Sequence, residues 1–273
     1  MPEGPEIRRA ADKIANALVG NVVESVEFGL PHLKHHEEIL TGSTVLEMET
    51  RGKALLTHFD NGHTIYSHNQ LYGRWWVMKR GKLPSTGRFL RLALHTKKHS
   101  ALLYSASEIE VLDEEGINTH RFLCKLAPDI LNAELSWREV AARLLDPRFR
   151  KRSLAALYLD QTFLAGVGNY LRSEILFAAG TDPKAKPQDL ERKVINKLAR
   201  STLLISQRAY ETGGITNPPQ LAAKLKKSGL TRGQYRHAVF GRDNRACYGC
   251  GEVVLKDAIS SRRIYWCPLC QYG

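Results

Sequence analysis

The chain has no long apolar segment. Its longest apolar run, residues 154–159, is far shorter than the ~20 residues that a membrane-spanning helix needs. Residues 1–20 interleave charged and apolar side chains, so they lack the continuous apolar core of a secretory signal. These absences argue against a membrane-spanning helix and a signal peptide. We therefore expect an intracellular, cytoplasmic protein without a membrane partner.

Cysteine is also scarce, with five residues in the chain of 273. Four of them form two C-x2-C pairs, Cys247 with Cys250 and Cys267 with Cys270. Paired knuckles at this separation present four thiolates tetrahedrally and are typical of structural zinc sites. Disulfides are the alternative, but an intracellular location disfavours them. Because these cysteines would fill all four coordination positions of the metal, we predict one structural Zn²⁺. The fifth cysteine, Cys124, is expected to be a small buried residue.

Acidic residues are too few to balance the basic ones. The chain has 40 Lys and Arg against 28 Asp and Glu, a net charge of +12. Residues 224–273 hold 10 basic and 3 acidic side chains and residues 131–223 hold 14 and 9, whereas residues 1–130 hold 16 of each. A concentrated positive field favours binding to a polyanion such as nucleic acid, because each phosphate that the protein neutralises releases counterions. The alternative to nucleic-acid binding, judged on charge alone, is a generally basic, soluble protein.

The spacing of apolar residues changes along the chain. Residues 6–20 have helical spacing and end at Gly20, a typical C-terminal cap. Seven short β-rich runs between residues 21 and 112, separated by turn signals, predict a β-sandwich. Helical spacing then dominates, in segments 135–145, 153–165, 168–179 and 188–210, with a loop at 213–220. We expect an α+β multidomain protein divided into residues 1–118, 119–230 and 231–273, the last a zinc-finger β-hairpin.

Two spots have the composition of phosphate-binding sites. Gly166 and Gly168 precede a helix start at Asn169, which would leave backbone N–H groups free to receive a phosphate. A tight turn between helices is the alternative. Arg262 and Arg263 lie between the cysteine pairs, on the expected loop of a two-stranded ribbon, where arginine can bind phosphate in bidentate fashion. A solvated loop is the alternative there.

A third spot is the turn in SHNQLYG, between two predicted strands. It presents Gln70, Leu71 and Tyr72, a polar, an apolar and an aromatic side chain. Such a trio can wedge into a stack of bases. Partly buried packing is the alternative.

Five motifs closely resemble the endonuclease VIII branch of the formamidopyrimidine-DNA glycosylase family. They are MPEGPEI, ETRGKALLTHF, SHNQLYG, LDQTFLAGVGNYLRSEIL and SSRRIYWCPLCQ, in that order from one end of the chain to the other. The resemblance implies an N-terminal helix and β-sandwich, then a helical domain with a helix-two-turn-helix element and a zinc finger. It also implies a base excision repair enzyme, associated with the nucleoid, that removes oxidised bases from duplex DNA and then cuts the strand. We expect it to act as a monomer on double-stranded DNA with oxidised bases or abasic sites.

The resemblance assigns catalytic roles to the N-terminal residues. Pro2, exposed when Met1 is removed, matches the family's amine nucleophile. An α-amine titrates near ~8 and a lysine near ~10.4, so more of the α-amine is free to attack at neutral pH. Glu3 matches the acid/base carboxylate that protonates the sugar ring oxygen, and Glu6 matches a second, supporting glutamate.

Further positions match by the same resemblance. Lys53 corresponds to the lysine that assists β-elimination, and Arg262 to the finger arginine of the δ-elimination, with Arg263 as the weaker candidate. Gln70 and Asn169 match DNA-contacting positions. Lys125 stands where the branch commonly has arginine, a change that would keep phosphate contact but lose bidentate geometry.

Three functions remain open. The first is a glycosylase and AP lyase acting on oxidised pyrimidines, which MPEGPE and the QLY trio favour. The second is a formamidopyrimidine-type enzyme acting mainly on oxidised purines. The third is a zinc-ribbon nucleic-acid-binding protein without chemistry, against which Pro2, Glu3 and Lys53 together argue, because binding alone needs none of them.

Overall fold

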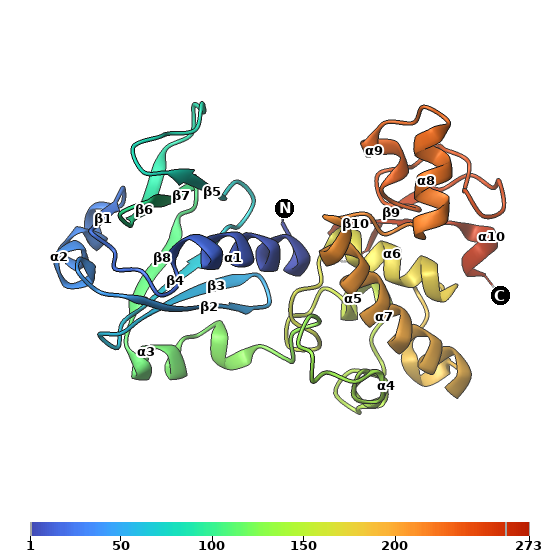
Figure 1. Ribbon diagram of the computed structural model, residues 1–273. Coiled ribbons are helices and arrows are strands. Elements are labelled where there is room, and N and C mark those ends of the chain that lie inside the picture. The colour runs from blue at the N-terminus through green and yellow to red at the C-terminus, as the bar shows by residue number, and fades with distance from the viewer. Residues whose placement is uncertain (1, 260, 273) are drawn as a thin grey trace. The chain divides into compact units, whose positions relative to one another are not determined.

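The computed structural model describes residues 2–259 and 261–272 and contains two compact units (Figure 1). The first unit comprises Pro2 and Glu6–Lys125, and the second comprises Glu3–Pro5 and the described residues from Leu126 onward. The division of the chain at residues 118 and 230 stays a prediction.

Helix α1 (Gly4–Leu18) forms because its apolar residues recur on one face. Ile7, Ala11, Ile14 and Leu18 are all buried. The helix is followed by Gly20 at φ +75°, a left-handed conformation that glycine adopts at low cost. The predicted helix at residues 6–20 is therefore confirmed.

The first unit contains the predicted β-sandwich, built from two antiparallel four-stranded sheets. One has the strand order β1 (Ser25–Phe28), β6 (Leu90–His95), β7 (His99–Tyr104) and β5 (Arg74–Lys79). The other has the order β2 (Val45–Arg51), β3 (Ala54–Phe59), β4 (Thr64–His68) and β8 (Glu108–Leu112). The last of the seven predicted β-rich runs, residues 101–112, contains parts of two strands, β7 and β8, because the chain turns at Ser105 with φ +58°.

The short helices η1 (Pro31–His36) and α2 (Glu37–Leu40) connect β1 to β2, and two more, α3 (Glu114–Thr119) and η2 (Leu123–Lys125), follow β8. The sandwich core is continuous with the buried face of α1 and contains Leu55, Ile65, Leu92 and Leu103.

Helices dominate the second unit. They are α4 (Trp137–Leu145), α5 (Leu154–Leu157), α6 (Asn169–Ala179), η3 (Pro187–Asp189), α7 (Arg192–Thr212), α8 (Pro219–Lys227) and α9 (Arg232–Tyr235). The predicted helix at 153–165 is wrong beyond its first turn. Asp160 accepts hydrogen bonds from the N–H and hydroxyl of Thr162, an arrangement that competes with the helix. The predicted loop at 213–220 ends earlier than expected, because Pro219 begins α8 at a position that suits proline.

The C-terminal ribbon consists of β9 (Leu255–Ile259), β10 (Arg262–Trp266) and the short helix α10 (Pro268–Gln271). Strand β10 lies against α6, where the Tyr265 N–H donates to the Ser173 hydroxyl at 3.3 Å. Arg262 and Arg263 were expected on the ribbon loop, but they are the first two residues of β10 and pair with Ile259 and Ala258.

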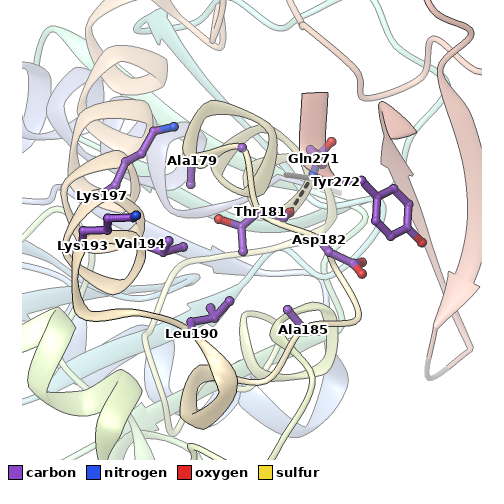
Figure 2. Close-up of a pocket in the computed structure, with 11 residues that line it drawn as sticks. Ala179, Thr181, Asp182, Ala185, Leu190, Lys193, Val194, Lys197, Gln271 and Tyr272 are labelled. Carbon is purple, nitrogen blue, oxygen red and sulfur yellow. Dashed lines mark hydrogen bonds between the residues drawn. The ribbon is translucent and has the colours of Figure 1, made fainter. Parts of the chain in front are cut away.

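A cavity of about 800 Å³ lies at the C-terminal end of α6 (Figure 2). Lys193 and Lys197 of α7 line one side of it, and the Gln271 amide donates to the Thr181 carbonyl at 3.0 Å on the other. Among the described residues that line it, none was predicted as a site residue. Within the part of the chain that the structure describes, no helix is both long and apolar enough to cross a membrane.

Candidate active site

The side chain of Glu3 lies at the N-terminal end of α6. Its Oε2 accepts hydrogen bonds from the backbone N–H groups of Gly168 (2.8 Å) and Leu171 (3.2 Å), and its Oε1 accepts one from Tyr170 (2.8 Å). Glu3 is only 3% exposed. The first N–H groups of a helix lack partners within the helix, and the helix dipole favours negative charge there. Helix α6 therefore holds the Glu3 carboxylate in a fixed position.

Two glycines make this close approach feasible. A Cβ atom on Gly168 would lie 2.4 Å from the Glu3 Cδ, so any side chain there would displace the carboxylate. Gly166 has φ +97°, a conformation strained for other residues, and its carbonyl accepts the Gly4 N–H at 2.9 Å. The sequence predicted N–H groups free to receive a phosphate at this helix start. That prediction is wrong for the three groups above, because they bind the Glu3 carboxylate.

Arg172, also on α6, was not predicted from the sequence. Its guanidinium is fully buried, and Nη2 donates to the Asn169 Oδ1 (3.1 Å) and to the Arg263 carbonyl (2.8 Å). Burial lowers the pKa of Arg172 to about 10, the charge of Glu3 opposes this effect, and the charge of Arg262 adds to it. Arg172 thus fixes the Asn169 side chain and joins α6 to β10, with Glu3 and Arg262 within its electrostatic reach.

Pro2 and Glu6 flank Glu3 in the sequence. Pro2 is half-buried. It immediately precedes Glu3, which is followed by the first residue of α1. Glu6 is half-buried in the first turn of α1, where a carboxylate interacts favourably with the helix dipole. Met1, whose removal would expose the Pro2 amine, lies outside the described residues. The roles of Pro2 and Glu6 stay predictions.

Lys53 lies on the turn between β2 and β3, half-buried. The strands on either side are braced by the Glu49 carboxylate, which accepts from Arg51 Nε at 2.6 Å and lies 3.0 Å from His58 Nε2. The hydrogen bond with His58, with the nearby Arg51 charge, lowers the pKa of Glu49 to about 2, although burial opposes this shift. These contacts limit the freedom of the turn that presents Lys53.

The turn after β4 carries the predicted wedge. Leu71 and Tyr72 are 52% and 65% exposed. Gln70 has φ +49°, and both ends of its amide are bonded: Nε2 donates to Glu108 Oε2 at 2.9 Å, and Oε1 accepts the Ser107 hydroxyl at 2.8 Å. Gln70 therefore braces the turn while remaining exposed, and Leu71 and Tyr72 are exposed beside it.

His68, at the end of β4, connects this turn to Lys53. Burial lowers the pKa of His68; the charge of Glu108 opposes this shift, and the charge of Lys53 reinforces it. The Nδ1 atom of His68 accepts the Gln70 backbone N–H at 3.1 Å, which requires that nitrogen to be unprotonated. The first unit thus places Lys53 within electrostatic reach of the base of the turn.

Lys125 ends the short helix η2 and is exposed, as a phosphate-binding side chain would be. Its neighbour Cys124 is exposed as well, so the prediction of a buried small residue is wrong. The reason is local: within the three-residue helix η2, Leu123 provides the buried side chain.

The other four cysteines form a cluster. Their Sγ atoms all lie within 4.8 Å of one another, with 3.4 Å between Cys250 and Cys267 and 3.9 Å between Cys247 and Cys270. A disulfide would need about 2.05 Å, whereas four thiolates about 2.3 Å from a tetrahedral zinc are about 3.8 Å apart. The cluster therefore fits a zinc ion and does not fit two disulfides.

The family models of two domains match the chain. Residues 1–107 match the formamidopyrimidine-DNA glycosylase N-terminal domain, and residues 126–228 match the helix-two-turn-helix domain of the same family. Among curated relatives, proteins named Endonuclease 8 from Salmonella arizonae and Salmonella typhimurium are 49% identical over 271 residues, which cover 99% of this chain and 100% of each relative.

Solved structures show the same fold. Lactococcus lactis Fpg in complex with DNA containing an abasic site has a TM-score of 0.81 at 21% identity, covering 99% of this chain and 100% of that one. The same protein with DNA containing an oxidised pyrimidine has a TM-score of 0.80 at 21% identity and covers both chains fully. A two-unit fold with a β-sandwich, a helix-two-turn-helix domain and a four-cysteine cluster defines a DNA glycosylase architecture. The chain belongs to the formamidopyrimidine-DNA glycosylase family.

Proposed function

We propose that the chain is a bifunctional DNA glycosylase and AP lyase of base excision repair that removes oxidised pyrimidines from duplex DNA. The observation that carries this proposal is the Glu3 carboxylate, which is buried against three backbone N–H groups at the N-terminal end of α6 and directly follows Pro2 in the chain. The 49% identity to proteins named Endonuclease 8 supports the pyrimidine branch. We further propose that the enzyme works in the cytoplasm on nucleoid DNA.

Pro2 is the proposed nucleophile. Its secondary amine attacks C1′ of the deoxyribose while Glu3 supplies the proton that the opening sugar ring oxygen needs. The departing base takes up the proton that the Pro2 nitrogen loses, and a cationic iminium remains between that nitrogen and C1′. This cation acts as an electron sink, so a proton is lost from C2′ and the 3′ phosphate is eliminated. In this scheme Lys53 assists the first elimination.

The direct test is nicking of a duplex that carries one abasic site. A lyase converts this duplex to a cut strand without any added nuclease, whereas a zinc-ribbon protein without chemistry only binds it. A panel of duplexes, each with one defined lesion, then separates the pyrimidine from the purine branch. Faster cleavage of oxidised purines than of oxidised pyrimidines would reverse our choice of branch.

Arg262 is proposed to promote the second, δ-elimination. We expect Arg262→Ala to keep base removal and first-strand scission within about twofold of the original rate, while δ-product falls about 10²-fold, the usual contribution of one acid–base group. Gel separation of the two strand ends measures this ratio. Arg263→Ala is the matched control, because it removes a neighbouring exposed arginine of β10. If that variant loses the δ-product instead, our assignment is one residue off.

Leu71 is proposed to fill the space left by an extruded base. Because unstacking an intact base costs a few kcal/mol, we expect Leu71→Ala to slow cleavage of a damaged duplex about tenfold, the effect of about 1.4 kcal/mol. Already abasic or single-stranded substrates should lose about twofold or less. Single-turnover rates on the three substrates give the comparison. An equal loss on all of them would indicate damage to the fold.

The four-cysteine cluster is proposed to hold one structural zinc ion through Cys247, Cys250, Cys267 and Cys270. Because zinc supplies the folding energy of such small units, we expect Cys247→Ser to release the metal, disorder the ribbon that carries Arg262 and abolish nicking. Zinc content and nicking are measured together. Cys124→Ser is the control, since Cys124 lies outside the cluster, and it should behave as the unmodified protein. Full nicking by Cys247→Ser would contradict the proposal.

A further inference from the structure

The charged residues of the first unit are unevenly distributed along the sequence. Residues 61–107 contain no Asp or Glu and 8 Lys and Arg, although residues 1–130 as a whole are balanced at 16 of each sign. This acid-free stretch begins before the turn of Leu71 and Tyr72 and extends through β5, β6 and β7. Its field would attract the phosphates of a DNA strand.

Within this stretch, residues 80–89 connect β5 to β6 by crossing the sheet. Both strands pair with β7, and their first residues, Arg74 and Leu90, lie opposite the same residue, Tyr104. The connection must therefore return along the full length of β5 to reach the start of β6. It brings Arg88 beside the wedge turn, where its Nη1 donates to the Tyr72 carbonyl.

The crossing segment covers the outer face of the sheet incompletely. That face is apolar, with Trp76, Leu90, Leu102 and Tyr104 in a cluster separate from the sandwich core. A cavity of about 630 Å³ remains beside it, lined in part by Leu102, Tyr104 and Phe89. Phe89 nevertheless stays 75% exposed. A large aromatic side chain so poorly packed stabilises the fold little, and most of its surface is available to a ligand.

The surroundings of Phe89 suit one class of ligand. The Arg91 guanidinium lies 5.9 Å from the ring centroid, Arg88 is its chain neighbour, and Tyr72 presents a second exposed aromatic ring on the turn that Arg88 contacts. One carboxylate, that of Glu27, lines the cavity, and it lies 3.3 Å from His95 Nε2. Aromatic rings interleaved with arginines bind DNA strands by stacking on bases and pairing with phosphates.

We propose that Phe89 is a second DNA-contacting side chain, which stacks on a nucleobase next to the position that Leu71 and Tyr72 contact. Arg88 and Arg91 face the phosphates of the same strand. The inference rests on the proposed function, because it assigns DNA to the same face as the wedge turn. It extends the DNA-binding surface of the first unit from one turn to Arg88, Phe89 and Arg91.

The test uses the full-length protein and a duplex with a reduced, uncleavable abasic analogue flanked by 2-aminopurine. Anisotropy gives the dissociation constant, and quenching of the 2-aminopurine reports stacking. We expect Phe89→Ala to weaken binding about tenfold and to reduce the quenching, since one base–aromatic stack has an effect of this order. Phe89→Trp should restore both readings.

Leu83→Ala is the matched control, because Leu83 is 70% exposed on the same segment but has no aromatic face. It should bind within about twofold of the original protein. Equal dissociation constants for Phe89→Ala and Leu83→Ala would overturn the inference. Nicking of an abasic duplex by the unmodified protein is scored separately: nicking without a Phe89 effect rejects this inference alone, and absence of nicking rejects the proposed function.

Discussion

A protein with extra residues fused ahead of Pro2 is expected to bind DNA normally but neither to cross-link to it nor to cut it. In such a protein the Pro2 nitrogen is an amide, which has no nucleophilic lone pair. Loss of the nucleophile should lower cutting by about 10⁴-fold or more, as in other enzymes that lose a covalent nucleophile. Cutting and binding are measured on the same abasic duplex.

The control removes the extra residues with a protease that leaves Pro2 at the N-terminus. Cutting should return, because the same chain then carries a free secondary amine. Undiminished cutting by the fused protein would mean that Pro2 is not the nucleophile.

Glu3→Gln is expected to slow excision of a damaged base by 10² to about 10⁴-fold, the range for one general acid–base group. The amide cannot donate the proton that the sugar oxygen needs. It also places an NH₂ group against N–H donors of α6 that now bind the carboxylate, which leaves polar groups unsatisfied. Single-turnover excision on a duplex with one oxidised pyrimidine measures the effect.

Pro2 is unchanged in this variant, so slow covalent trapping on an already abasic duplex should persist. Glu6→Gln is the matched control, since Glu6 is a half-buried acid of the same helix start, and it should retain more activity than Glu3→Gln. Excision by Glu3→Gln within threefold of the original rate, about 0.6 kcal/mol, would contradict the role of Glu3.

Local patterns allowed much of the fold to be predicted. The spacing of Ile7, Ala11, Ile14 and Leu18 predicted α1, and the two C-x2-C pairs predicted the cysteine cluster, because in each case the partners are close in sequence. Boundaries were less predictable. Residues 153–165 have helical composition, yet the side chain of Asp160 bonds locally and the helix ends after one turn.

The contacts that hold the candidate site were not predictable in this way. The family resemblance marked Glu3 as a candidate, but its partners at the N-terminal end of α6 lie about 165 residues away, as the separation from Gly168 shows. No periodic pattern marks Arg172, His68 or Glu108, because each is a polar residue whose role depends on tertiary neighbours. The local charge excess at residues 61–107 was hidden by counting over the whole N-terminal half.

The central claim is that catalysis passes through an iminium on the nitrogen of Pro2. Borohydride reduction during turnover on an abasic duplex tests it most directly, because an iminium is reduced to a stable covalent complex and a hydrolytic intermediate is not. Digestion and mass analysis then locate the adduct. We predict that it lies on the N-terminal peptide that begins at Pro2. An adduct on the peptide that contains Lys53, or no trapped complex in a reaction that cuts DNA, would contradict the account.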